Sequence, residues 1–585
     1  MSQGVDWSED GPPRSRQFGD LYFSAEDGLA ESRLVFLEGC GLADAWRDRR
    51  AFTVAELGFG TGLNVAALLD LWVREGPPEA RLSIFSVEAY PIDSTDAARA
   101  LAGWPALAPV ADLLIECWPG RARGFHRVSL PELRATLDLA VMEAGEALAA
   151  WSGAADAWFL DGFAPALNPK MWRPEVLALV AARSAPGARL ATYSAAGEVR
   201  RGLAAVGFEI ARAPGFGRKR HRLEGRLPGE APERPSPRVA IVGAGIAGVS
   251  LAQAFAGLGV QTQIFAGDAP PASTGPAALV APRLDAGLAA PAALFAQAFA
   301  RARQVFVSRP GAVLSEGALQ LEVGPKDPRR FAVIAESALF EPASMQRLDS
   351  AAVSARLGET APAALDVTNA LVVDPAPLLA AETIPANVER LLRTDGVWRL
   401  MDAAGATLAE AEIVCVAAGM ASARLVPDLR LRPVRGQASF APGAHCPATA
   451  LFGAWAAPTP GGVLFGATHD RDDEGVDERA GDHRRNLEAV AAVLPQLAGR
   501  LAARPLTARV GLRATTPDYL PLAGPAGPGL FLLTGLGSRG FTLAPLLAEH
   551  VAALALDRPS PLPTPLAGLV EPGRFARRAA RKGRQ

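Results

Sequence analysis

Three glycines at alternate positions follow the first long apolar run of the sequence. Residues 56–62 read E-L-G-F-G-T-G, and Gly58, Gly60 and Gly62 leave the backbone bare where a ligand can approach. The next predicted strand ends in Glu88, whose carboxylate is suited to accept hydrogen bonds from ribose hydroxyls. The spacing is neither G-x-G-x-x-G nor a P-loop, which disfavours those two sites. We predict a nucleotide-type ligand here, with a tight turn that binds nothing as the alternative.

A second acidic residue, Asp161, follows an apolar stretch and opens a loop rich in glycine and proline. Phe163 and Trp172 lie in the same loop and are available to stack on a base. The acid and the rigid loop resemble an arrangement often found in amino-group methyltransferases, whose SN2 displacement requires a neutral amine held in line with the methyl carbon. Asp161 is suited to orient such an amine or to accept its proton. A carboxylate that only caps the loop is the alternative.

A different glycine pattern, G-A-G-I-A-G, occupies residues 243–248 between an apolar strand and a helix-like run. In that context Gly243, Gly245 and Gly248 predict a dinucleotide site, with the pyrophosphate at the helix N-terminus. The acid expected about 20 residues later is displaced, because Ala266 lies near that position. Asp268, two residues beyond, is the candidate for the ribose.

Basic side chains suggest further contacts with anions. Arg513 is a candidate clamp for a substrate carboxylate, with a structural salt bridge as the alternative. The densest basic cluster is Arg218, Lys219, Arg220 and Arg222, which predicts an RNA contact or an ordinary solvated face. The tail at residues 574–584 is a second basic cluster with the same two interpretations.

The two glycine turns belong to two strand–turn–helix units, at residues 52–72 and 238–259. The stretch between them, residues 225–237, contains four prolines, which predicts a linker between domains at 1–224 and 238–585. Further strands are predicted at residues 82–87, 157–160, 189–193, 412–416 and 529–534. Their alternation with helix-compatible segments favours an α/β fold with parallel sheets. Residues 319–400 are less regular and are interpreted as part of an inserted substrate-binding subdomain.

The composition limits the class of protein. A chain of 585 residues holds about two to four domains, and its formal net charge of −2 makes any basic patch local. Four distant cysteines without a C-x-x-C pair disfavour a disulfide scaffold and a cysteine zinc site. The polar N-terminus and the lack of a long apolar stretch predict a cytoplasmic protein without a membrane span. Neither a metal nor an obligate protein partner is expected.

Four blocks of the sequence closely resemble the methyltransferase half of the bifunctional MnmC family, at residues 18–39, 55–64, 156–172 and 215–220. The turn at 56–62 is also similar to motif I of Rossmann-like S-adenosylmethionine (SAM) methyltransferases. The resemblance implies that Asp161 serves the amine and that SAM contacts Glu56, Gly58, Gly60, Gly62, Glu88 and Glu146. Glu146 is a departure, because the family usually has aspartate there.

The second half resembles the FAD-dependent oxidoreductase half of the same family and, with it, the glycine oxidase and D-amino-acid oxidase class. The similar segments are VCVAAG at 414–419, RGQ at 435–437 and GLGSRG at 535–540. The resemblance implies that FAD, not NAD, binds the 243–248 turn. Further contacts to the flavin are implied for Gly419, Gly537, Ser538, Arg539 and Gly540.

The family resemblance implies two successive reactions on the wobble uridine of certain tRNAs. FAD-dependent removal of the carboxymethyl group from 5-carboxymethylaminomethyl-(2-thio)uridine leaves a primary amine, 5-aminomethyl-(2-thio)uridine, and glyoxylate. SAM-dependent N-methylation then gives 5-methylaminomethyl-(2-thio)uridine.

Two segments depart from the family pattern and keep alternatives open. Residues 272–284 lack the Asn, Gln and Tyr of the family's ASGN-x-QGALYPLL block, and residues 452–460 replace a G-x-G-Y-x-T-P block. One alternative is a fused small-molecule amine oxidase and N-methyltransferase without an RNA substrate. The other is a methyltransferase whose flavin-binding half is catalytically weakened and serves as a structural or tRNA-docking module.

Overall fold

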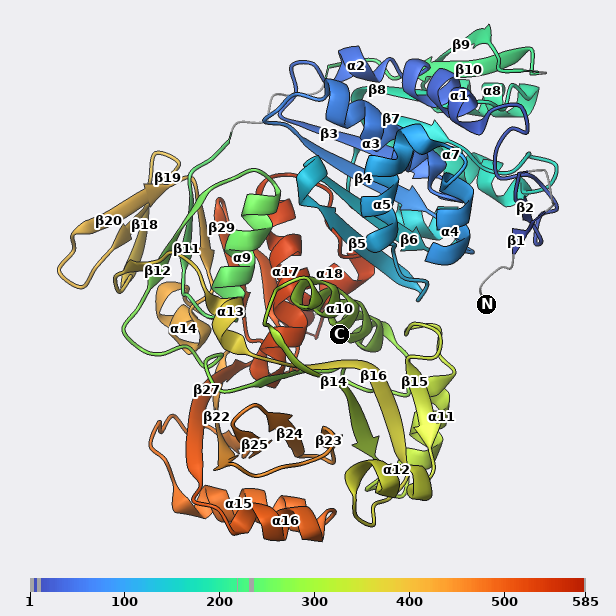
Figure 1. The fold of residues 1–585 in the computed structure, drawn as a ribbon. Coiled ribbons are helices and arrows are strands. Elements are labelled where there is room, and N and C mark those ends of the chain that lie inside the picture. The colour runs from blue at the N-terminus through green and yellow to red at the C-terminus, as the bar shows by residue number, and fades with distance from the viewer. Residues whose placement is uncertain (1–4, 8–11, 218, 231–235, 583–585) are drawn as a thin grey trace. The chain divides into compact units, whose positions relative to one another are not determined.

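The computed structural model of the chain describes residues 5–7, 12–217, 219–230 and 236–582. Two units emerge, one made of Met1–Ser236, Gly257–Gly259 and Arg558–Thr564, and the other of the remaining residues (Figure 1). Residues 231–235 of the predicted linker lie outside the described residues, and its first two residues end strand β10. The predicted boundaries at 224 and 238 stay a prediction.

An eight-stranded sheet forms the first unit, in the order β5-β6-β4-β3-β7-β8-β10-β9. Its strands are β3 (Ala51–Leu57), β4 (Arg81–Val87), β5 (Gly124–Leu130), β6 (Ala135–Val141), β7 (Ala155–Leu160), β8 (Ser184–Thr192), β9 (Glu209–Pro214) and β10 (His221–Arg226). The five central strands are parallel, whereas β5, at one edge, and β10 run antiparallel to their neighbours β6 and β8. The α/β fold and the strands predicted at 82–87, 157–160 and 189–193 are therefore confirmed.

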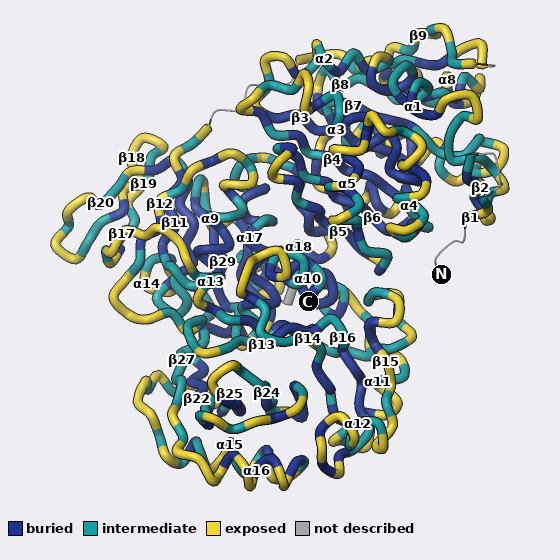
Figure 2. Tube along the Cα trace, viewed as in Figure 1, coloured by how far each residue is buried: buried dark blue, intermediate teal, exposed yellow. Residues whose placement is uncertain are grey.

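Strand β3 is buried along its whole length because helices cover both faces of the sheet (Figure 2). Phe52 and Val54 pack into one apolar cluster, while Ala55 and Leu57 point the other way into a second. This near-continuous apolar run is typical of a central parallel strand. Trp151 belongs to the second cluster, and its ring stacks on the Phe85 ring of β4.

The helices of the first unit follow the alternation that the sequence predicts. They are α1 (Gly28–Ser32), α2 (Leu42–Ala45), α3 (Leu63–Glu75), α4 (Ser94–Leu101), α5 (Ala108–Glu116), α6 (Ala144–Ala150), α7 (Pro174–Ala182) and α8 (Gly197–Ala205). Short turns of other helix types are η1 (Arg33–Glu38), η2 (Pro105–Leu107), η3 (Pro131–Leu133) and η4 (Pro169–Trp172), and β1 (Val5–Asp6) pairs with β2 (Arg14–Ser15). Within the described residues no single helix is long and apolar enough to cross a bilayer, and the bent pair Ser94–Leu101 and Pro105–Glu116 meets that test only as a pair.

A six-stranded sheet, β17-β12-β11-β21-β29-β28, carries the glycine turn of the second unit. Its strands are β11 (Val239–Val242), β12 (Thr262–Ala266), β17 (Ile384–Pro385), β21 (Ile413–Val416), β28 (Leu522–Gly527) and β29 (Leu530–Thr534). All neighbours are parallel except β28, which returns beside β29. The strands predicted at 412–416 and 529–534 are confirmed as β21 and β29.

A second, mostly antiparallel sheet lies in the same unit, in the order β13-β16-β14-β23-β24-β25-β22-β26. Its strands are β13 (Ala278–Val280), β14 (Val313–Leu321), β16 (Ala364–Val373), β22 (Arg432–Pro442), β23 (Ala450–Leu451), β24 (Trp455–Thr459), β25 (Gly462–Gly466) and β26 (Asp470–Arg471), with β15 (Met345–Leu348) on β16 and β27 (Thr507–Thr515) on β22. Residues 319–400 are therefore more regular than expected. Their strand β16 is buried at eight of ten positions, and this apolar run lacks the simple alternation that marks a half-exposed strand.

The remaining elements of the second unit are a small sheet and the helices. The sheet is β18 (Arg390–Thr394), β19 (Val397–Met401) and β20 (Thr407–Ala411). The helices are α9 (Ile246–Gly257), α10 (Ala290–Val307), α11 (Asp327–Ala335), α12 (Ser350–Leu357), α13 (Pro375–Leu379), α14 (Ser422–Leu425), α15 (Ala480–Ala491), α16 (Pro495–Ala502), α17 (Gly540–Ala555), α18 (Thr564–Val570) and α19 (Arg574–Lys582), with short turns η5 (Gly419–Ala421) and η6 (Gly537–Arg539).

The basic tail begins inside the second unit and not on its surface. Arg574 is only 2% exposed, and its guanidinium donates to both carboxylate oxygens of Asp518 at 3.1 and 2.9 Å. It also donates to the carbonyls of Leu520 and Pro521 at 2.6 and 2.9 Å. Arg578 reaches the same carboxylate at 2.6 Å from a half-exposed position. The first arginine of the tail is therefore a structural anchor for α19.

We expect Arg574→Ala to lower the local stability around β28 and α19 by about 3–5 kcal/mol, because it removes the buried partner of the Asp518 carboxylate and the donor to the Leu520 and Pro521 carbonyls. The matched control Arg578→Ala removes an exposed pair and should cost under about 1 kcal/mol. Hydrogen exchange of peptides from β28 to α19 measures both. Equal exchange in the two variants would show that Arg574 does not anchor the helix.

Candidate functional site

A cavity of about 330 Å³ lies in the first unit at the carboxyl ends of β3, β4 and β7. This edge of a parallel sheet is where nucleotide-type ligands bind in open α/β folds. Its walls include Gly58, Gly60, Glu88 and Asp161, four of the predicted site residues. The N-terminal segment, residues 17–36, supplies much of the opposite wall.

The turn after β3 needs glycine because two loops touch there. Gly58 has a φ of +99°, and a Cβ on it would lie 1.9 Å from the carbonyl oxygen of Asp161. Gly60 faces the cavity beside the Tyr22 ring, and Gly62 caps α3 and packs on Trp118 without lining the cavity. The bare backbone of this turn is thus a cradle that a side chain would fill.

Glu88 closes the cradle from the next strand. Its carboxylate accepts the N–H of Gly60 at 3.1 Å through Oε2 and the N–H of Tyr90 at 3.0 Å through Oε1. Burial raises the pKa of Glu88, and these hydrogen bonds act in the opposite direction. A carboxylate has about four acceptor positions, so Glu88 can also accept a hydrogen bond from a ligand hydroxyl.

A buried carboxyl group, that of Glu56, and a half-buried one, that of Asp161, share one amide donor beside the cradle. Asn64 Nδ2 donates to Glu56 Oε1 at 3.1 Å and to Asp161 Oδ2 at 2.6 Å. Ser86 Oγ donates to the other oxygen of Glu56 at 2.6 Å. Burial raises the pKa of Glu56 to about 8 and that of Asp161 to about 7, although the hydrogen bonds lower both. Among the described residues no loop N–H donates to the carboxyl of Asp161, which differs from the alternative interpretation of this residue as a loop cap.

Two other predicted SAM contacts lie elsewhere. Glu56 is 1% exposed and does not line the cavity, because Asn64 stands between them. Glu146 is exposed on α6, and its carboxylate pairs with Arg123. The acid of this segment that lines the cavity is Glu143, three residues earlier. The longer side chain at 146 therefore does not compensate for the departure from the family.

Sequence reasoning missed the aromatic wall supplied by the N-terminal segment. The Phe163 ring of the predicted loop lies 4.8 Å from Phe18 and 5.5 Å from Tyr22, measured between ring centroids. Asp20 accepts the N–H of Ala164 at 3.2 Å and ties the segment to the loop. The block at residues 18–39 resembled the family, but no periodicity in it indicates a position over the cavity.

The basic cluster divides into residues with different environments. Arg218 lies outside the described residues. Lys219 pairs with Glu31 at 2.9 Å and lies 3.8 Å from the centre of the Tyr193 ring, beside the cavity. Arg222 is buried and donates to Glu224 and to the Pro214 carbonyl.

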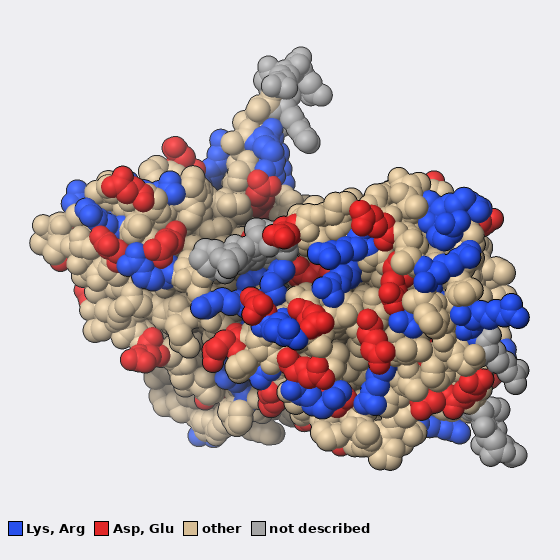
Figure 3. Space-filling view, turned by 90° about the horizontal axis from the view of Figure 1, so that it is seen from above, with Lys and Arg blue, Asp and Glu red and all other residues tan. Residues whose placement is uncertain are grey.

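Arg220 is exposed, as an RNA contact requires. On the face of the molecule in Figure 3, basic and acidic side chains are interspersed over most of the surface. The cluster is therefore not a uniform patch, and Arg222 is not free to reach a phosphate.

The glycine turn of the second unit joins β11 to the N-terminus of α9. Gly248 packs so closely that a Cβ would lie 1.8 Å from the carbonyl oxygen of Gly243, whereas a Cβ on Gly245 would meet side-chain atoms of Ser273 and Pro271 at 3.3 and 3.4 Å. Gly248 therefore lets α9 pack on the turn, and Gly243 makes room for the Ala417 carbonyl oxygen, which would lie 2.5 Å from an added Cβ. Gly245 has the most space of the three. This division is what a dinucleotide turn requires.

The segment that departs from the family, 272–284, is held against this turn. Ser273 Oγ accepts the N–H of Ile246 at 3.1 Å. Arg509 on β27 donates to the carbonyls of Thr274 at 2.7 Å and Pro271 at 2.8 Å. Although its sequence differs from the family pattern, this segment is therefore hydrogen-bonded in place beside the first turn of α9.

The other predicted flavin contacts gather at the same edge of the six-stranded sheet. Gly419 follows β21, and Gly537, Ser538 and Arg539 form η6 after β29, just before Gly540 begins α17. Arg539 is half-buried, and this partial loss of water lowers its pKa to about 10. Its guanidinium donates to the Ala281 carbonyl at 3.0 Å.

Asp268 occupies a different environment from these residues. It forms a reciprocal pair with Asn387, accepting from Nδ2 at 2.5 Å and donating its own backbone N–H to Oδ1 at 3.1 Å.

Arg513 lies across β22 next to a polar network. A Cβ on Gly436 would be 2.3 Å from its Cζ, so the glycine of the R-G-Q segment makes room for the guanidinium. Nη1 donates to the Thr468 carbonyl at 3.3 Å, and no carboxylate of the described residues pairs with Arg513. Burial lowers its pKa. The structural salt bridge that was the alternative interpretation is therefore not seen.

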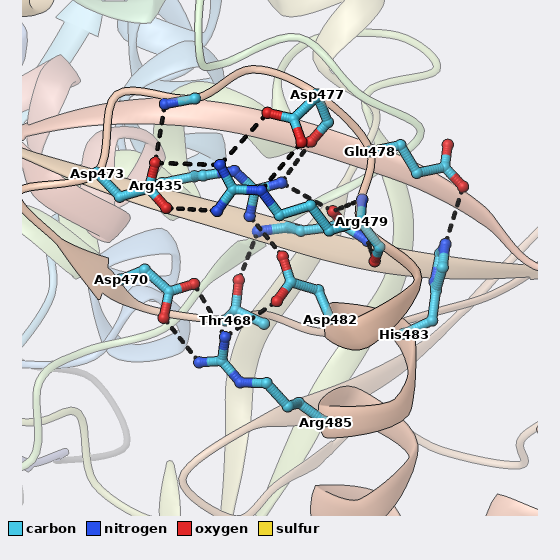
Figure 4. Close-up of polar contacts among 12 residues, drawn as sticks. Arg435, Thr468, Asp470, Asp473, Asp477, Glu478, Arg479, Asp482, His483 and Arg485 are labelled. Carbon is cyan, nitrogen blue, oxygen red and sulfur yellow. Dashed lines mark hydrogen bonds and ion pairs between the residues drawn. The ribbon is translucent and has the colours of Figure 1, made fainter.

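Arg435, the first residue of that segment, instead bonds other protein groups through both of its terminal nitrogens, Nη1 and Nη2. It is 0% exposed and donates to Asp482 at 2.5 Å, to Gln437 at 2.9 Å and to the Asp477 carbonyl at 2.5 Å (Figure 4). Arg479 and Arg485 extend the network to Asp473 and Asp470. This network supports the strand that carries Arg513, and within the described residues no group of metal-binding side chains occurs.

The buried carboxyl of Glu56 predicts a pH-dependent stability for the first unit. Because its folded pKa of about 8 exceeds its unfolded value, the stabilisation is full at low pH and is lost as pH rises from about 4.5 to 8. We expect Glu56→Gln to reduce this loss, by at most about 1.4 kcal/mol per pH unit. Urea unfolding followed by tryptophan fluorescence reports this unit, which holds eight of the ten tryptophans. An unchanged slope between pH 5 and 8 would contradict the assignment.

Comparisons with known proteins agree with this geometry. A family model described as S-adenosyl-L-methionine-dependent methyltransferase matches residues 105–228, and one described as FAD dependent oxidoreductase matches residues 238–554. Three relatives are named tRNA 5-methylaminomethyl-2-thiouridine biosynthesis bifunctional protein MnmC. The one from a Caulobacter species is 57% identical and covers 98% of both chains.

The relative from Caulobacter vibrioides is 56% identical over 97% of both chains. That from Maricaulis maris is 40% identical over 99% of this chain and 97% of its own. The chain thus belongs to the bifunctional MnmC family, with a SAM-dependent methyltransferase domain and an FAD-dependent oxidoreductase domain.

Proposed function

We propose that this chain completes a modified wobble uridine of tRNA in two steps. The second unit removes the carboxymethyl group of 5-carboxymethylaminomethyl-(2-thio)uridine with FAD. The first unit then methylates the resulting amine with SAM to give 5-methylaminomethyl-(2-thio)uridine. The observation that carries the proposal is a cavity in which a glycine cradle and the carboxyl of Asp161 face one another. Family membership along the whole chain favours this function over a fused small-molecule enzyme.

In the first unit, the residues of the cavity hold two reactants in line. Gly58, Gly60 and Glu88 would hold SAM, which supplies the methyl group when bound. Asp161 Oδ2 is engaged by Asn64, and Oδ1 receives no hydrogen bond from the described residues. That free oxygen is suited to accept an N–H of the amine and to take its proton as the new C–N bond forms. The carboxyl is ionised above its pKa of about 7, so methyl transfer should increase with pH.

In the second unit, guanidinium groups hold the acidic part of the substrate. The turn at Gly243–Gly248 would hold the FAD pyrophosphate at the N-terminus of α9. FAD would supply the oxidising power for removing a hydride from the CH₂ between the amine and the carboxylate. Arg513 has no carboxylate partner among the described residues and would bind the substrate carboxylate with its planar fork.

The tRNA contacts and the cellular location are also part of the proposal. Arg220 is the exposed candidate for a phosphate contact, together with Lys219 at the edge of the cavity and Arg218. We place the protein in the cytoplasm, where tRNA is modified, as a soluble enzyme without a metal or an obligate protein partner.

We expect Asp161→Ala to slow methyl transfer to aminomethyl-tRNA by about 10²–10⁴-fold while the FAD content stays at the wild-type level. The two reactions use residues of separate sheets, so damage to one should not reach the other. The matched control Asp112→Asn alters an exposed acid on α5 and should methylate normally. Liquid chromatography and mass spectrometry of digested tRNA gives the rate. Methylation by Asp161→Ala at the wild-type rate would contradict the proposed role.

We expect Gly245→Leu to give a folded but colourless protein, because the side chain would occupy the pyrophosphate position. The matched control Gly257→Ala, at the last residue of α9, has no atom within 4 Å of the added Cβ and should stay yellow. The absorbance of FAD released on denaturation measures the content of each variant. A yellow Gly245→Leu protein would mean that the cofactor binds elsewhere.

A further inference from the structure

We propose that Asn64 is the positioning residue of the methyltransferase site, the donor that holds Asp161 in the orientation needed to accept the amine. This inference rests on the proposed function of the first unit. It assigns a role to a side chain that lines the cavity, whereas Glu56 behind it does not.

Both hydrogens of the Asn64 amide are used. One points to Glu56 Oε1 at 3.1 Å and the other to Asp161 Oδ2 at 2.6 Å. Asn64 is the second residue of α3, directly after the glycine turn, so the cradle for SAM also fixes the position of its amide. The strand end of β3, the first turn of α3 and the strand end of β7 are therefore linked through one side chain.

The hydrogen bonds select one orientation of the amide when Asp161 is ionised. Ser32 Oγ, itself buried at the end of α1, donates to Asn64 Oδ1 at 2.7 Å. A flipped amide would turn its oxygen toward the ionised carboxylate of Asp161, which has no proton to donate. Ser32 thus orients Asn64, and Asn64 orients Asp161.

This orientation has a chemical consequence. With Oδ2 engaged, Oδ1 is the oxygen left for the amine. A hydrogen bond to a carboxylate also favours its ionised form, which is the form that accepts a proton. The other groups that act on Asp161 are Glu31 from α1, Glu56 from β3, Tyr193 after β8 and Lys219 before β10. Lys219 is the only cation among them. None of these groups replaces the Asn64 amide as a hydrogen-bond donor to the Asp161 carboxylate.

The test compares methyl-transfer rates of wild type, Asn64→Ala, Asn64→Asp and Ser32→Ala on aminomethyl-tRNA between pH 6 and 9. We expect kcat of Asn64→Ala to fall on the order of 10–100-fold. In the plot of kcat against pH, the rise on the acidic side should move up by about one to two pH units, because the Asp161 carboxylate has lost a hydrogen-bond donor. This rise is the acidic limb of the profile. The KM for SAM should stay near the wild-type value. The substrate amine titrates equally in every variant, so the difference between profiles belongs to the enzyme.

Two further variants separate positioning from space filling. Asn64→Asp keeps the shape but replaces the donor by a third carboxyl, so its limb should move further up than that of Asn64→Ala. If Asn64 only filled space, Asn64→Asp would behave like wild type at high pH and the inference would be overturned. Should Asn64→Ala fail to fold, Ser32→Ala decides: a lower kcat at unchanged KM for SAM supports the inference, and wild-type kinetics overturn it.

The same assay separates this inference from the proposed function. Wild-type protein that does not methylate aminomethyl-tRNA at any pH contradicts the function itself. Wild-type protein that methylates, beside Asn64 variants with an unmoved acidic limb, contradicts only the role of Asn64.

Discussion

The backbone contact between the turns after β3 and β7 is the constraint on which the first site depends. A Cβ on Gly58 would lie 1.9 Å from the Asp161 carbonyl, so only a residue without a side chain lets the two turns meet. Their contact brings the first turn of α3 within hydrogen-bond distance of Asp161 and seals Glu56 beneath Asn64. Two carboxyl groups thereby lie close together away from bulk water, and desolvation raises both of their pKa values.

Each unit has its candidate site at the carboxyl ends of its own parallel strands, but the side chains at the two sites carry opposite charges. The first gathers carboxyl groups, including Asp161 and Glu88, around a glycine cradle. The second holds half-buried guanidinium groups that lack carboxylate partners among the described residues, namely those of Arg513 and Arg539. Acids suit an amine that must lose a proton, and guanidiniums suit a substrate that carries a carboxylate. The family's two reactions, oxidation and then methylation, use both kinds of site, and this chain carries an acidic site for the amine and a guanidinium site for the carboxylate.

The sequence predicted the strands that carry the chemistry, because central parallel strands are long apolar runs bounded by glycine. It also placed Asp161 and Glu88 at the correct strand ends. It did not predict Asn64, although this residue ends the quoted motif at 55–64, because its role depends on contacts from β3, α1 and β7 together. Glu146 shows the opposite failure: family position indicated a ligand contact, but Arg123 holds the side chain at the surface. Arg222 and Arg574 appeared as basic surface in the sequence, yet both are buried, since a charge run carries no sign of a local partner.

The central claim is that one chain carries out both steps in order, and the direct test uses tRNA from cells that lack this protein. Purified protein is incubated with that tRNA in air, with and without SAM, and the wobble nucleosides are identified by mass spectrometry. Without SAM, 5-carboxymethylaminomethyl-(2-thio)uridine should disappear as 5-aminomethyl-(2-thio)uridine accumulates, and adding SAM should convert the latter to the methylated nucleoside. A carboxymethyl nucleoside that persists in air, or an aminomethyl nucleoside that persists with SAM, would contradict the account.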